Sequence, residues 1–543
     1  MLGICLEILF RNRVARFAHE MPLEFSFSCS FLDLLCLLYL PYLPCLLCLP
    51  YLPCLLCGQC SSLIVYFHLT LGLRITHKLY SRMDSVPDYL KNLQSLVSTP
   101  FVSSTSLSSS SVVSALEGSG LGSGSDGKLK FLLVSTHCHQ YTGYSKVSYG
   151  ILRQLAKVPW LSVTHYGFQK FPQQQFAEGY RPYPSNVTVI DAAAQEEPFE
   201  QGFGFKKLPD VIKALKPDIV MIYNDMSIVG KFIVEMDKSG VAKTTKTWVY
   251  CDQVYTTQLQ GYLDMLNLKA ERIFAFTNEW KKCLKDQGIT RPLDVILHGF
   301  EKEVYKTLPR SEIRKNLKIP DEAFVFLNVN RNQPRKRYDL LIMAFTELVV
   351  KYPTKPIFMM CICDKGEKGG WWLFELYQRE LKLRGVNVEQ FGTRLMISSQ
   401  DMVFKDEDIN VFYNCADVGV NAADGEGWGL CNFEHMGVGV PQVVPNLGGF
   451  KEFCNSKNSV LVDAKQRYYL PMVYSPVGGE ACAMDPHDLC LGMEEYLLDT
   501  TKREEHGVEA KKTALSYTWE RAVEPLVRRL KQEKEDKEAE AEA

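Results

Sequence analysis

From residue 128 onward, short apolar runs alternate with helical stretches, and this alternation constrains the fold more than any other feature of the chain. Strands of a parallel sheet are buried on both faces, so they read as continuous apolar runs, each followed by a crossover helix. The first run, residues 130–135, precedes a helical stretch at residues 145–157. The same pattern predicts further strands at residues 162–166, 187–190, 218–223, 246–250, 272–276 and 294–298.

A second series of the same kind begins at residue 324. It predicts strands at residues 324–329, 356–363, 386–391 and 417–420, and helices at residues 339–351, 371–384 and 406–414. Two doubly wound sheets in tandem place a ligand at the carboxyl ends of their strands, in the space between them. We therefore predict an α/β fold with two Rossmann-like parallel-sheet domains that face each other across a cleft.

These two series divide the chain into expected domains. They predict an N-terminal domain at residues 128–300 and a C-terminal domain at residues 301–515. A helix at 519–531 opens the final segment, residues 516–543, and the charged tail at 533–543 is expected to fray. A Ser/Gly-rich stretch within residues 83–127 has little apolar surface to bury and is predicted to be a linker.

Residues 1–82 form a low-complexity hydrophobic segment in which residues 40–48 recur unchanged as residues 49–57. Paired Cys-x-x-Cys spacing suggests zinc, but leucines fill the spacer and no histidine lies near. A membrane span is disfavoured because repeated prolines would break its helix. We favour a start codon placed too far upstream, with Met83 opening the native protein, and keep membrane anchoring as the alternative.

Composition sets limits on function and location. A formal net charge of −2 gives no reason to expect nucleic acid or an anionic membrane as a partner. The cysteines from Cys138 to Cys490 stand singly in apolar runs, as free thiols do in a reducing compartment. We therefore expect a cytoplasmic protein without a disulfide framework.

The segment 425–437, Gly-Glu-Gly-Trp-Gly-Leu-Cys-Asn-Phe-Glu-His-Met-Gly, is the densest chemical signal. Glycines at a strand-to-helix turn let the backbone approach a ligand closely, and the helix N-terminus favours phosphate. Glu426 would lie in the loop and Glu434 about two turns into the helix. A carboxylate accepts hydrogen bonds from the vicinal hydroxyls of a sugar or ribose.

The Glu426-x7-Glu434 spacing, followed by the Gly-Gly-x-x-Glu element at residues 448–452, resembles glycosyltransferase family 4 (glycosyl transferases group 1). The resemblance extends from about residue 130 to about residue 519. It implies the GT-B fold, with residues 128–300 as the acceptor domain and residues 301–515 as the nucleotide-sugar donor domain. It also implies that Glu426 engages the transferred sugar, while Glu434, Gly448 and Gly449 bind the nucleotide.

Two further segments are similar to phosphate-binding elements of that family. Residues 330–337, Asn-Arg-Asn-Gln-Pro-Arg-Lys-Arg, follow a strand, and by resemblance Arg331 and Lys336 clamp the donor diphosphate. A basic solvated turn or a nucleic-acid patch is the alternative, and the neighbouring arginines are expected to be exposed. Gly143 corresponds to the family's glycine loop. His137 and His139 are interpreted as loop residues near the acceptor, because the family needs no metal.

The chain departs from the family pattern at residues 251–252. Many members carry a His-Asp pair in the N-terminal domain, and Cys251-Asp252 stands in that place. Asp252 is the candidate polar residue facing the reacting centre. Residues 296–300 resemble the interdomain hinge.

The resemblance implies a retaining, metal-independent hexosyltransferase of carbohydrate biosynthesis. Arg331 and Lys336 would stabilise the departing diphosphate, and Glu426 and Asp252 would act at the sugar. The partners implied are a nucleotide diphosphate sugar, with no other cofactor, and a carbohydrate, lipid or protein acceptor. An inactive GT-B binding or scaffold protein and a GT-B sugar-nucleotide epimerase are the alternatives. RNA binding is disfavoured, because no aromatics interleave with the basic residues.

Overall fold

The computed structural model describes residues 127–171, 180–194, 196, 200–363, 369–398, 403–472 and 474–543. The chain divides into two units, Met1–Val86 and Pro87–Ala543, and the described residues all belong to the second. The repeated segment at 40–57, Met83 and the Ser/Gly-rich stretch lie outside the described residues, so the interpretations placed on them stay predictions. Within the described part, no helix combines the length and the apolar character needed to cross a membrane.

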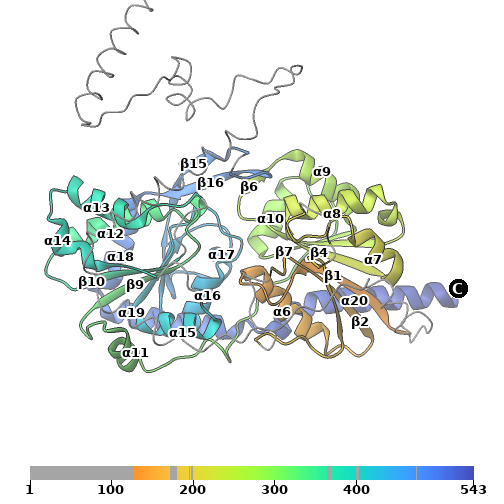
Figure 1. The fold of residues 1–543 in the computed structure, drawn as a ribbon, viewed down its shortest axis with the longest axis horizontal. Helices are drawn as coiled ribbons and strands as arrows, with labels where there is room; N and C mark the ends of the chain where they lie inside the picture. The colour runs from red at the N-terminus through yellow and green to blue at the C-terminus, as the bar shows by residue number, and fades with distance from the viewer. Residues whose placement is uncertain are drawn as a thin grey trace, which may run out of the picture. The chain divides into compact units, whose positions relative to one another are not determined.

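The first half of the described chain is built on a seven-stranded parallel sheet with strand order β3-β2-β1-β4-β5-β7-β8 (Figure 1). Its strands are β1 (Leu129–Thr136), β2 (Leu161–Phe168), β3 (Val187–Asp191), β4 (Ile219–Asp225), β5 (Lys246–Asp252), β7 (Arg272–Ala275) and β8 (Leu293–Val295). Its helices are α6 (Gly143–Leu155), α7 (Leu208–Leu215), α8 (Met226–Lys238), α9 (Gln260–Lys269) and α10 (Asn278–Asp286), with the 3-10 turn η2 (Val241–Lys243). Every strand predicted in this half is present.

The second half is built on a six-stranded parallel sheet with strand order β11-β10-β9-β12-β13-β14. Its strands are β9 (Phe324–Val329), β10 (Ile357–Ile362), β11 (Leu395–Ile397), β12 (Val418–Val420), β13 (Gln442–Pro445) and β14 (Ser459–Val462). Its helices are α11 (Arg310–Leu317), α12 (Tyr338–Lys351), α13 (Leu373–Leu383), α15 (Asp406–Cys415), α16 (Leu430–Gly437), α17 (Phe450–Phe453), α18 (Pro486–Leu498) and α19 (Thr500–Ser516). The short turns η3 (Pro334–Lys336), α14 (Val388–Phe391) and η4 (Gly392–Arg394) complete it.

The strand predicted at residues 386–391 is wrong. Residues 388–391 form the helical turn α14, because the Asn387 side chain accepts a hydrogen bond from the Glu389 backbone at 2.9 Å and so caps a helix start. The edge strand of this sheet is β11 instead, which pairs with β10.

Both sheets change direction in strand order beside a central strand, and this places the site. The order reverses between β1 and β4 in the first sheet and between β9 and β12 in the second. In such sheets a ligand binds in the crevice outside the carboxyl ends of the strands at this switch point. The relevant segments are therefore the loop from β1 into α6, the loop from β9 into α12, and the loop from β12 into α16.

A third, antiparallel sheet joins the two halves and was not predicted. It has the order β15-β16-β6, with β15 (Ala464–Tyr469) and β16 (Gly478–Met484) from the second half and β6 (Thr256–Gln258) from the first. Glu480 pairs in register with Thr256, so the halves share backbone hydrogen bonding as well as side-chain contacts.

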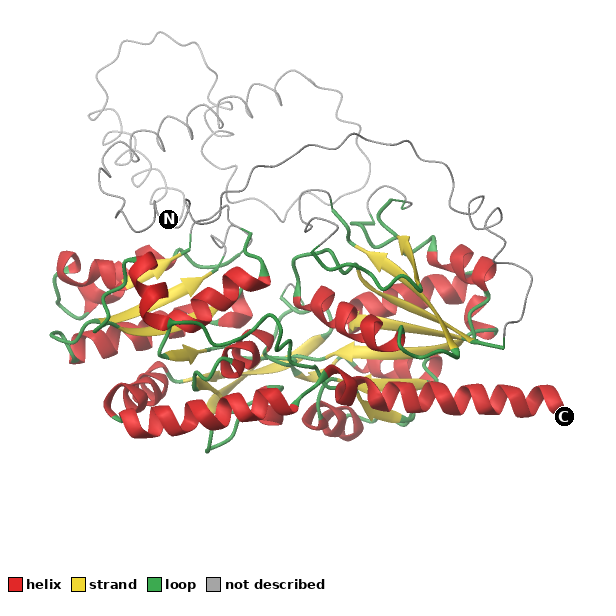
Figure 2. Ribbon diagram, turned by 90° about the horizontal axis from the view of Figure 1, so that it is seen from below, coloured by secondary structure: helices red, strands yellow, loops and turns green. Residues whose placement is uncertain are grey.

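The expected fraying of the charged tail is wrong. Helix α20 runs from Trp519 to Glu542 and lies alongside the first half (Figure 2). Glu533 pairs with Lys246 at 2.5 Å, and Lys537 pairs with Asp218 at 2.7 Å. The first part of α20 is anchored by buried apolar residues, and these ion pairs, together with i,i+4 pairs such as Lys531–Glu535, keep the charged tail helical beyond them.

Candidate functional site

Glu426 lies in the loop between β12 and α16, at the carboxyl edge of the second sheet. Its side chain is buried at 7% exposure. The backbone of this loop is held by the next turn, because Gly449 N–H donates to the Glu426 carbonyl at 2.9 Å. A Cβ at Gly449 or at Gly448 would collide with backbone atoms of residues 426–428. The close approach of two backbone segments therefore accounts for the paired glycines.

Two cations from the loop after β9 converge on the Glu426 carboxylate. Lys336 Nζ donates to Glu426 Oε2, and Arg335 Nη1 lies 3.4 Å from the same oxygen. Burial alone would raise the pKa of Glu426, but Lys336 and Arg335 outweigh it and lower that pKa. Burial, and then the neighbouring Arg335, lower the pKa of Lys336. The expectation that Arg335 is exposed is wrong, since it is partly buried against Glu426.

Arg331 is placed differently from Lys336, although both belong to the predicted clamp. Arg331 is exposed in the same loop, whereas Lys336 is buried. The next arginine, Arg337, pairs with Asp339 at 2.8 Å on α12. The cations that reach Glu426 are thus Lys336, as expected, and Arg335.

Asp252, at the carboxyl end of β5, faces this group from the first half. Its Oδ2 accepts a hydrogen bond from Tyr144 Oη at 2.6 Å, while Oδ1 is buried without a partner among the described residues. Oδ1 lies against Gly427, where any Cβ would collide with it. Burial, assisted by Asp225 and Glu426 and opposed by Tyr144 and Arg335, raises the pKa of Asp252 to about 6.

Cys251 precedes Asp252 in the place where the family often has histidine. It is fully buried, and burial raises the pKa of its thiol well above the ordinary value. It is therefore a neutral apolar side chain of the sheet, and Asp252 alone brings polar atoms to this position.

Glu434, on α16, forms a second group. Its side chain is buried at 5% exposure, and Tyr413 Oη donates to its Oε2 at 2.9 Å. Its Oε1 accepts from Lys146 Nζ of α6 at 2.7 Å. Burial raises the pKa of Glu434, with Lys146 opposing that effect. A Cβ at Gly143, at the start of α6, would lie 3.0 Å from the side chain of Leu430, so the starts of α6 and α16 are close to each other here.

The two histidines after β1 lie in a loop, as expected, and both are buried. His137 stacks edge-on against His139 with ring centroids 4.8 Å apart. Burial, and then the neighbouring His165 and His139, lower the pKa of His137 to about 2, so its ring is neutral. No group of three or more metal-binding side chains occurs in the described part of the chain.

The structure thus brings the predicted Lys336, Glu426 and Asp252 together, and places Glu434 with Gly143 nearby. Several contacts were missed: that of Tyr144 with Asp252, those of Lys146 and Tyr413 with Glu434, and that of Arg335 with Glu426. Lys146 had one available signal, its position directly after the predicted glycine loop. The rest carry no signal, because their role depends on contacts between segments far apart in the sequence.

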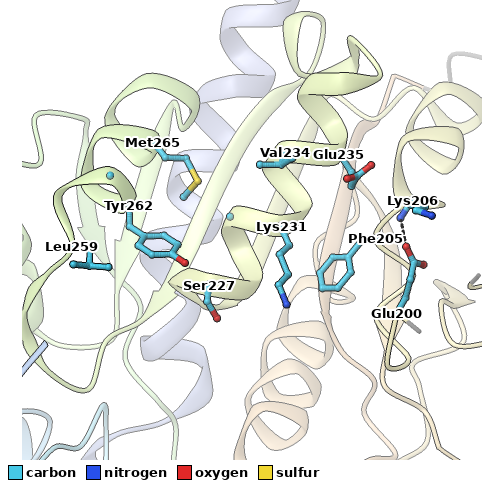
Figure 3. Close-up of a pocket in the computed structure, with 12 residues that line it drawn as sticks. Glu200, Phe205, Lys206, Ser227, Lys231, Val234, Glu235, Leu259, Tyr262 and Met265 are labelled. Carbon is cyan, nitrogen blue, oxygen red and sulfur yellow. Dashed lines mark hydrogen bonds between the residues drawn. The ribbon is translucent and has the colours of Figure 1, made fainter. Parts of the chain in front are cut away.

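A separate cavity of about 670 Å³ lies between α8 and α9 in the first half (Figure 3). Figure 3 shows Tyr262 and Met265 of α9 facing Lys231 of α8, with Phe205 beside Lys231. The cavity shares no residue with the Glu426 or Glu434 groups.

Part of the chain matches a described protein family. Residues 309–468 match the family described as glycosyl transferases group 1. The chain contains a glycosyl transferases group 1 segment. That segment includes Lys336, Glu426 and Glu434, so the residues that the motif singled out lie in the matched part.

Curated relatives of the chain are described as D-inositol 3-phosphate glycosyltransferases. The one from Geodermatophilus obscurus is 24% identical over 262 residues, which cover 48% of this chain and 52% of that protein. The one from Corynebacterium urealyticum is 28% identical over 218 residues, covering 39% and 44%. The chain spans about half the length of the curated relatives it matches.

Solved structures confirm the predicted fold. Anabaena Alr3699/HepE in complex with UDP and glucose aligns with a TM-score of 0.55 at 16% identity, over 74% of this chain and 100% of that one. Sucrose-phosphate synthase from Thermosynechococcus elongatus aligns with a TM-score of 0.54 at 14% identity, over 75% and 99%. The group 1 segment therefore belongs to a GT-B arrangement of two Rossmann-like domains.

Proposed function

We propose that the chain is a retaining, metal-independent glycosyltransferase that moves a hexose from a nucleotide diphosphate sugar to an acceptor hydroxyl. The observation that carries the proposal is the convergence of Lys336 and Arg335 on buried Glu426 at the switch point of the second sheet. Asp252 faces the same group from the first sheet. Two cations, a sugar-binding carboxylate and a polar group from the opposite domain are the parts that this chemistry requires.

The cations have the role of stabilising the leaving group. A departing nucleoside diphosphate develops negative charge, and fixed cations in a water-poor site stabilise it strongly. Lys336 is buried and Arg335 partly so, and both already compensate a carboxylate. When a donor binds, Lys336 and Arg335 would contact both Glu426 and the diphosphate, and the exposed Arg331 would be a third cation in contact with the diphosphate.

Retention follows from attack on the same face that the diphosphate leaves. The bond from the anomeric carbon to phosphate oxygen breaks, and a bond from that carbon to the acceptor oxygen forms on the same side. The acceptor's proton passes to the departing phosphate oxygen. Glu426 holds hydroxyls of the transferred sugar, and Asp252, which is largely ionised above pH 6, orients the reacting centre.

The donor and acceptor classes come from the compared proteins. One structural neighbour is a complex with UDP and glucose, so UDP-glucose is the first donor to test. The curated relatives are named for a phosphorylated polyol acceptor. For this chain we propose a hydroxyl of a carbohydrate, lipid or protein as the acceptor, with polyols and sugar phosphates as first candidates.

The test measures release of nucleoside diphosphate by the full chain from UDP-, GDP- and ADP-sugars, with and without acceptors. Lys336→Ala and Glu434→Ala should abolish release. Lys465→Ala and Glu520→Ala are matched controls, because each removes an exposed member of a surface ion pair. NMR of the product's anomeric centre reports retention, and activity in EDTA reports metal independence.

Release from one donor, lost in both site variants and kept in both controls, supports the proposal. Nucleotide binding without release in any donor and acceptor combination would instead indicate an inactive GT-B binding protein. Conversion of the sugar nucleotide without an acceptor would indicate an epimerase.

A further inference from the structure

The Glu434 carboxylate is compensated by a lysine from the opposite half of the molecule. Lys146 lies in the first turns of α6, after the Thr142 cap, and its Nζ reaches Glu434 Oε1 on α16 at 2.7 Å. The same Nζ lies 2.9 Å from Asp406 Oδ1 on α15 and donates to Tyr305 Oη at 2.6 Å. An ammonium group has three N–H donors, so its hydrogen-bonding capacity is filled.

The resemblance implies that Glu434 binds the nucleotide, where its carboxylate would hold the ribose, and this arrangement conflicts with that role. A carboxylate that holds ribose must present acceptor oxygens to the ligand, but Oε1 faces Lys146 and Oε2 faces Tyr413. The Glu434 side chain is only 5% exposed, so the ribose has no access to it in this arrangement. Donor binding therefore requires one of the two partners to move.

Of the two partners, Lys146 is the one that can move more easily. Its side chain is 23% exposed, and a lysine stem carries a point charge through a wide range of positions. Tyr413, in contrast, is fully buried beneath Glu434. When Lys146 moves, Asp406 still keeps Arg181, which lies 2.6 Å away and is buried. After Lys146 moves, the Asp406 carboxylate is thus still paired with Arg181, and only the Glu434 carboxylate, where the donor's ribose would bind, loses its cation.

The place to which Lys146 would move is set by the fold. Helix α6 begins at the switch point of the first sheet, and a Cβ at Gly143, its first residue, would lie 3.0 Å from the side chain of Leu430, the first residue of α16. Two helix N-termini therefore lie close together within reach of the Lys146 stem, and helix N-termini attract phosphate. A diphosphate at this position offers an ammonium group a stronger partner than a carboxylate that it shares with Asp406.

We propose that Lys146 exchanges partners during donor binding: it holds Glu434 in the empty protein and transfers to the donor diphosphate, which frees Glu434 for the ribose. The inference rests on the proposed function and deepens it by naming a diphosphate-binding residue in the N-terminal half. It makes recognition of the two parts of a nucleotide cooperative, because each part favours the same displacement of Lys146.

The first test uses the wild-type full chain. UDP, GDP and ADP are titrated by calorimetry, and the nucleoside of the diphosphate that binds is then titrated with and without inorganic pyrophosphate. Pyrophosphate should raise nucleoside affinity severalfold, and the nucleoside should raise pyrophosphate affinity by the same factor. An unchanged or lowered affinity overturns the exchange. Binding of none of the three diphosphates overturns the proposed function itself.

The second test uses Lys146→Met, which keeps the length of the stem and removes the charge. It should weaken nucleoside diphosphate binding about tenfold or more, strengthen nucleoside binding, and abolish the pyrophosphate effect. If Lys146 only held the two halves together, its removal would raise the affinity for both the nucleoside diphosphate and the nucleoside. If its role were purely structural, its removal would lower both affinities. Lys146→Arg should keep the diphosphate preference.

Lys157→Met is the matched control, because Lys157 follows α6 and pairs with Glu520 of α20 at 3.0 Å on the surface. It should change neither affinity. If Lys146→Met fails to fold, the pyrophosphate experiment on the wild-type chain still decides the proposal.

Discussion

Glu426 and Glu434 stand eight residues apart in one motif, yet the structure compensates them in different ways. Glu426 is paired by Lys336 and Arg335, which belong to its own half of the molecule. Glu434 is paired by Lys146, which belongs to the other half. The ion pairs of the first group therefore do not depend on how the two halves are docked, whereas those of the second group do. A shared motif thus supports two groups with different dependence on domain closure.

The largest effect is expected from breaking the group that belongs to one half. Lys336→Met leaves Glu426 buried with only Arg335 nearby, at 3.4 Å. Removing one member of a buried ion pair costs about 3–5 kcal/mol, because the other charge is left uncompensated. Urea unfolding at pH 7.5 measures this loss. Lys465→Met, at an exposed pair, should cost well under about 1 kcal/mol. Equal losses in the two variants would show that Glu426 is not held as described.

Asp252 is a carboxylate that faces Glu426 from the opposite half, and its substitution tests that arrangement. Its pKa is raised to about 6, so the folded state binds its proton more tightly than the unfolded state does. Stability should therefore fall as pH rises from about 4 to about 6, and the deficit should persist at pH 7.5. Asp252→Asn removes the titration, so unfolding should show a gain of up to about 3 kcal/mol at pH 7.5.

The same substitution should leave stability nearly unchanged at pH 4, where the wild-type carboxyl is protonated. If Asp252 orients the reacting centre, the wild type loses glycosyl transfer below about pH 6, and Asp252→Asn has low activity throughout. A stabilised variant with full activity would remove Asp252 from the mechanism.

A smaller effect is expected from the backbone that supports Glu426. A Cβ at Gly449 would collide with the backbone of residues 427 and 428. Gly449→Ala should therefore shift the Glu426 loop and cost about 1–3 kcal/mol. Gly392→Ala is the control, because no atom lies within 4 Å of its added Cβ and its backbone is already helical, with φ of −57°. That control should be neutral or slightly stabilising, and a destabilised control would show that the cost is not specific to the loop.

The fold was largely predictable because the strands of a buried parallel sheet are recognisable in the local sequence as short apolar runs. β1 and β9 read as apolar runs whatever lies beside them. The antiparallel sheet of β6, β15 and β16 was missed because β6 has only three residues and β15 is largely exposed, and because β6 pairs with β16 across more than 200 residues. At residues 386–391 two β-branched valines suggested a strand, but the capping Asn387 favours the start of a helical turn. In α20, ion pairs with the first half held a tail whose composition alone suggested fraying.

The site was predictable to the extent that it lies within one half. Glu426 and Lys336 were found because a motif and a basic loop after a strand both belong to the second sheet. Arg335 was wrongly expected to be exposed. The sequence does not show which of several adjacent basic side chains points toward Glu426 and which points toward solvent. Lys146 and Tyr144 were missed because their partners, Glu434 and Asp252, lie more than 100 residues away. Contacts of that kind follow from the docking of the two domains and leave no local pattern.

The smallest effect is expected from the pair that crosses between the halves, and it distinguishes the two glutamates most directly. Lys146→Met removes the charge that compensates Glu434, but the Lys146 side chain is 23% exposed, against 7% for Lys336. Loosening of the two halves lets water reach Glu434, so the loss of stability should be about 1 kcal/mol, which is typical of a partly solvated pair. Urea unfolding measures that loss, and small-angle scattering of the same variant should show a larger radius of gyration than the wild type. A loss as large as that of Lys336→Met, with unchanged dimensions, would show that the second group is as permanent as the first.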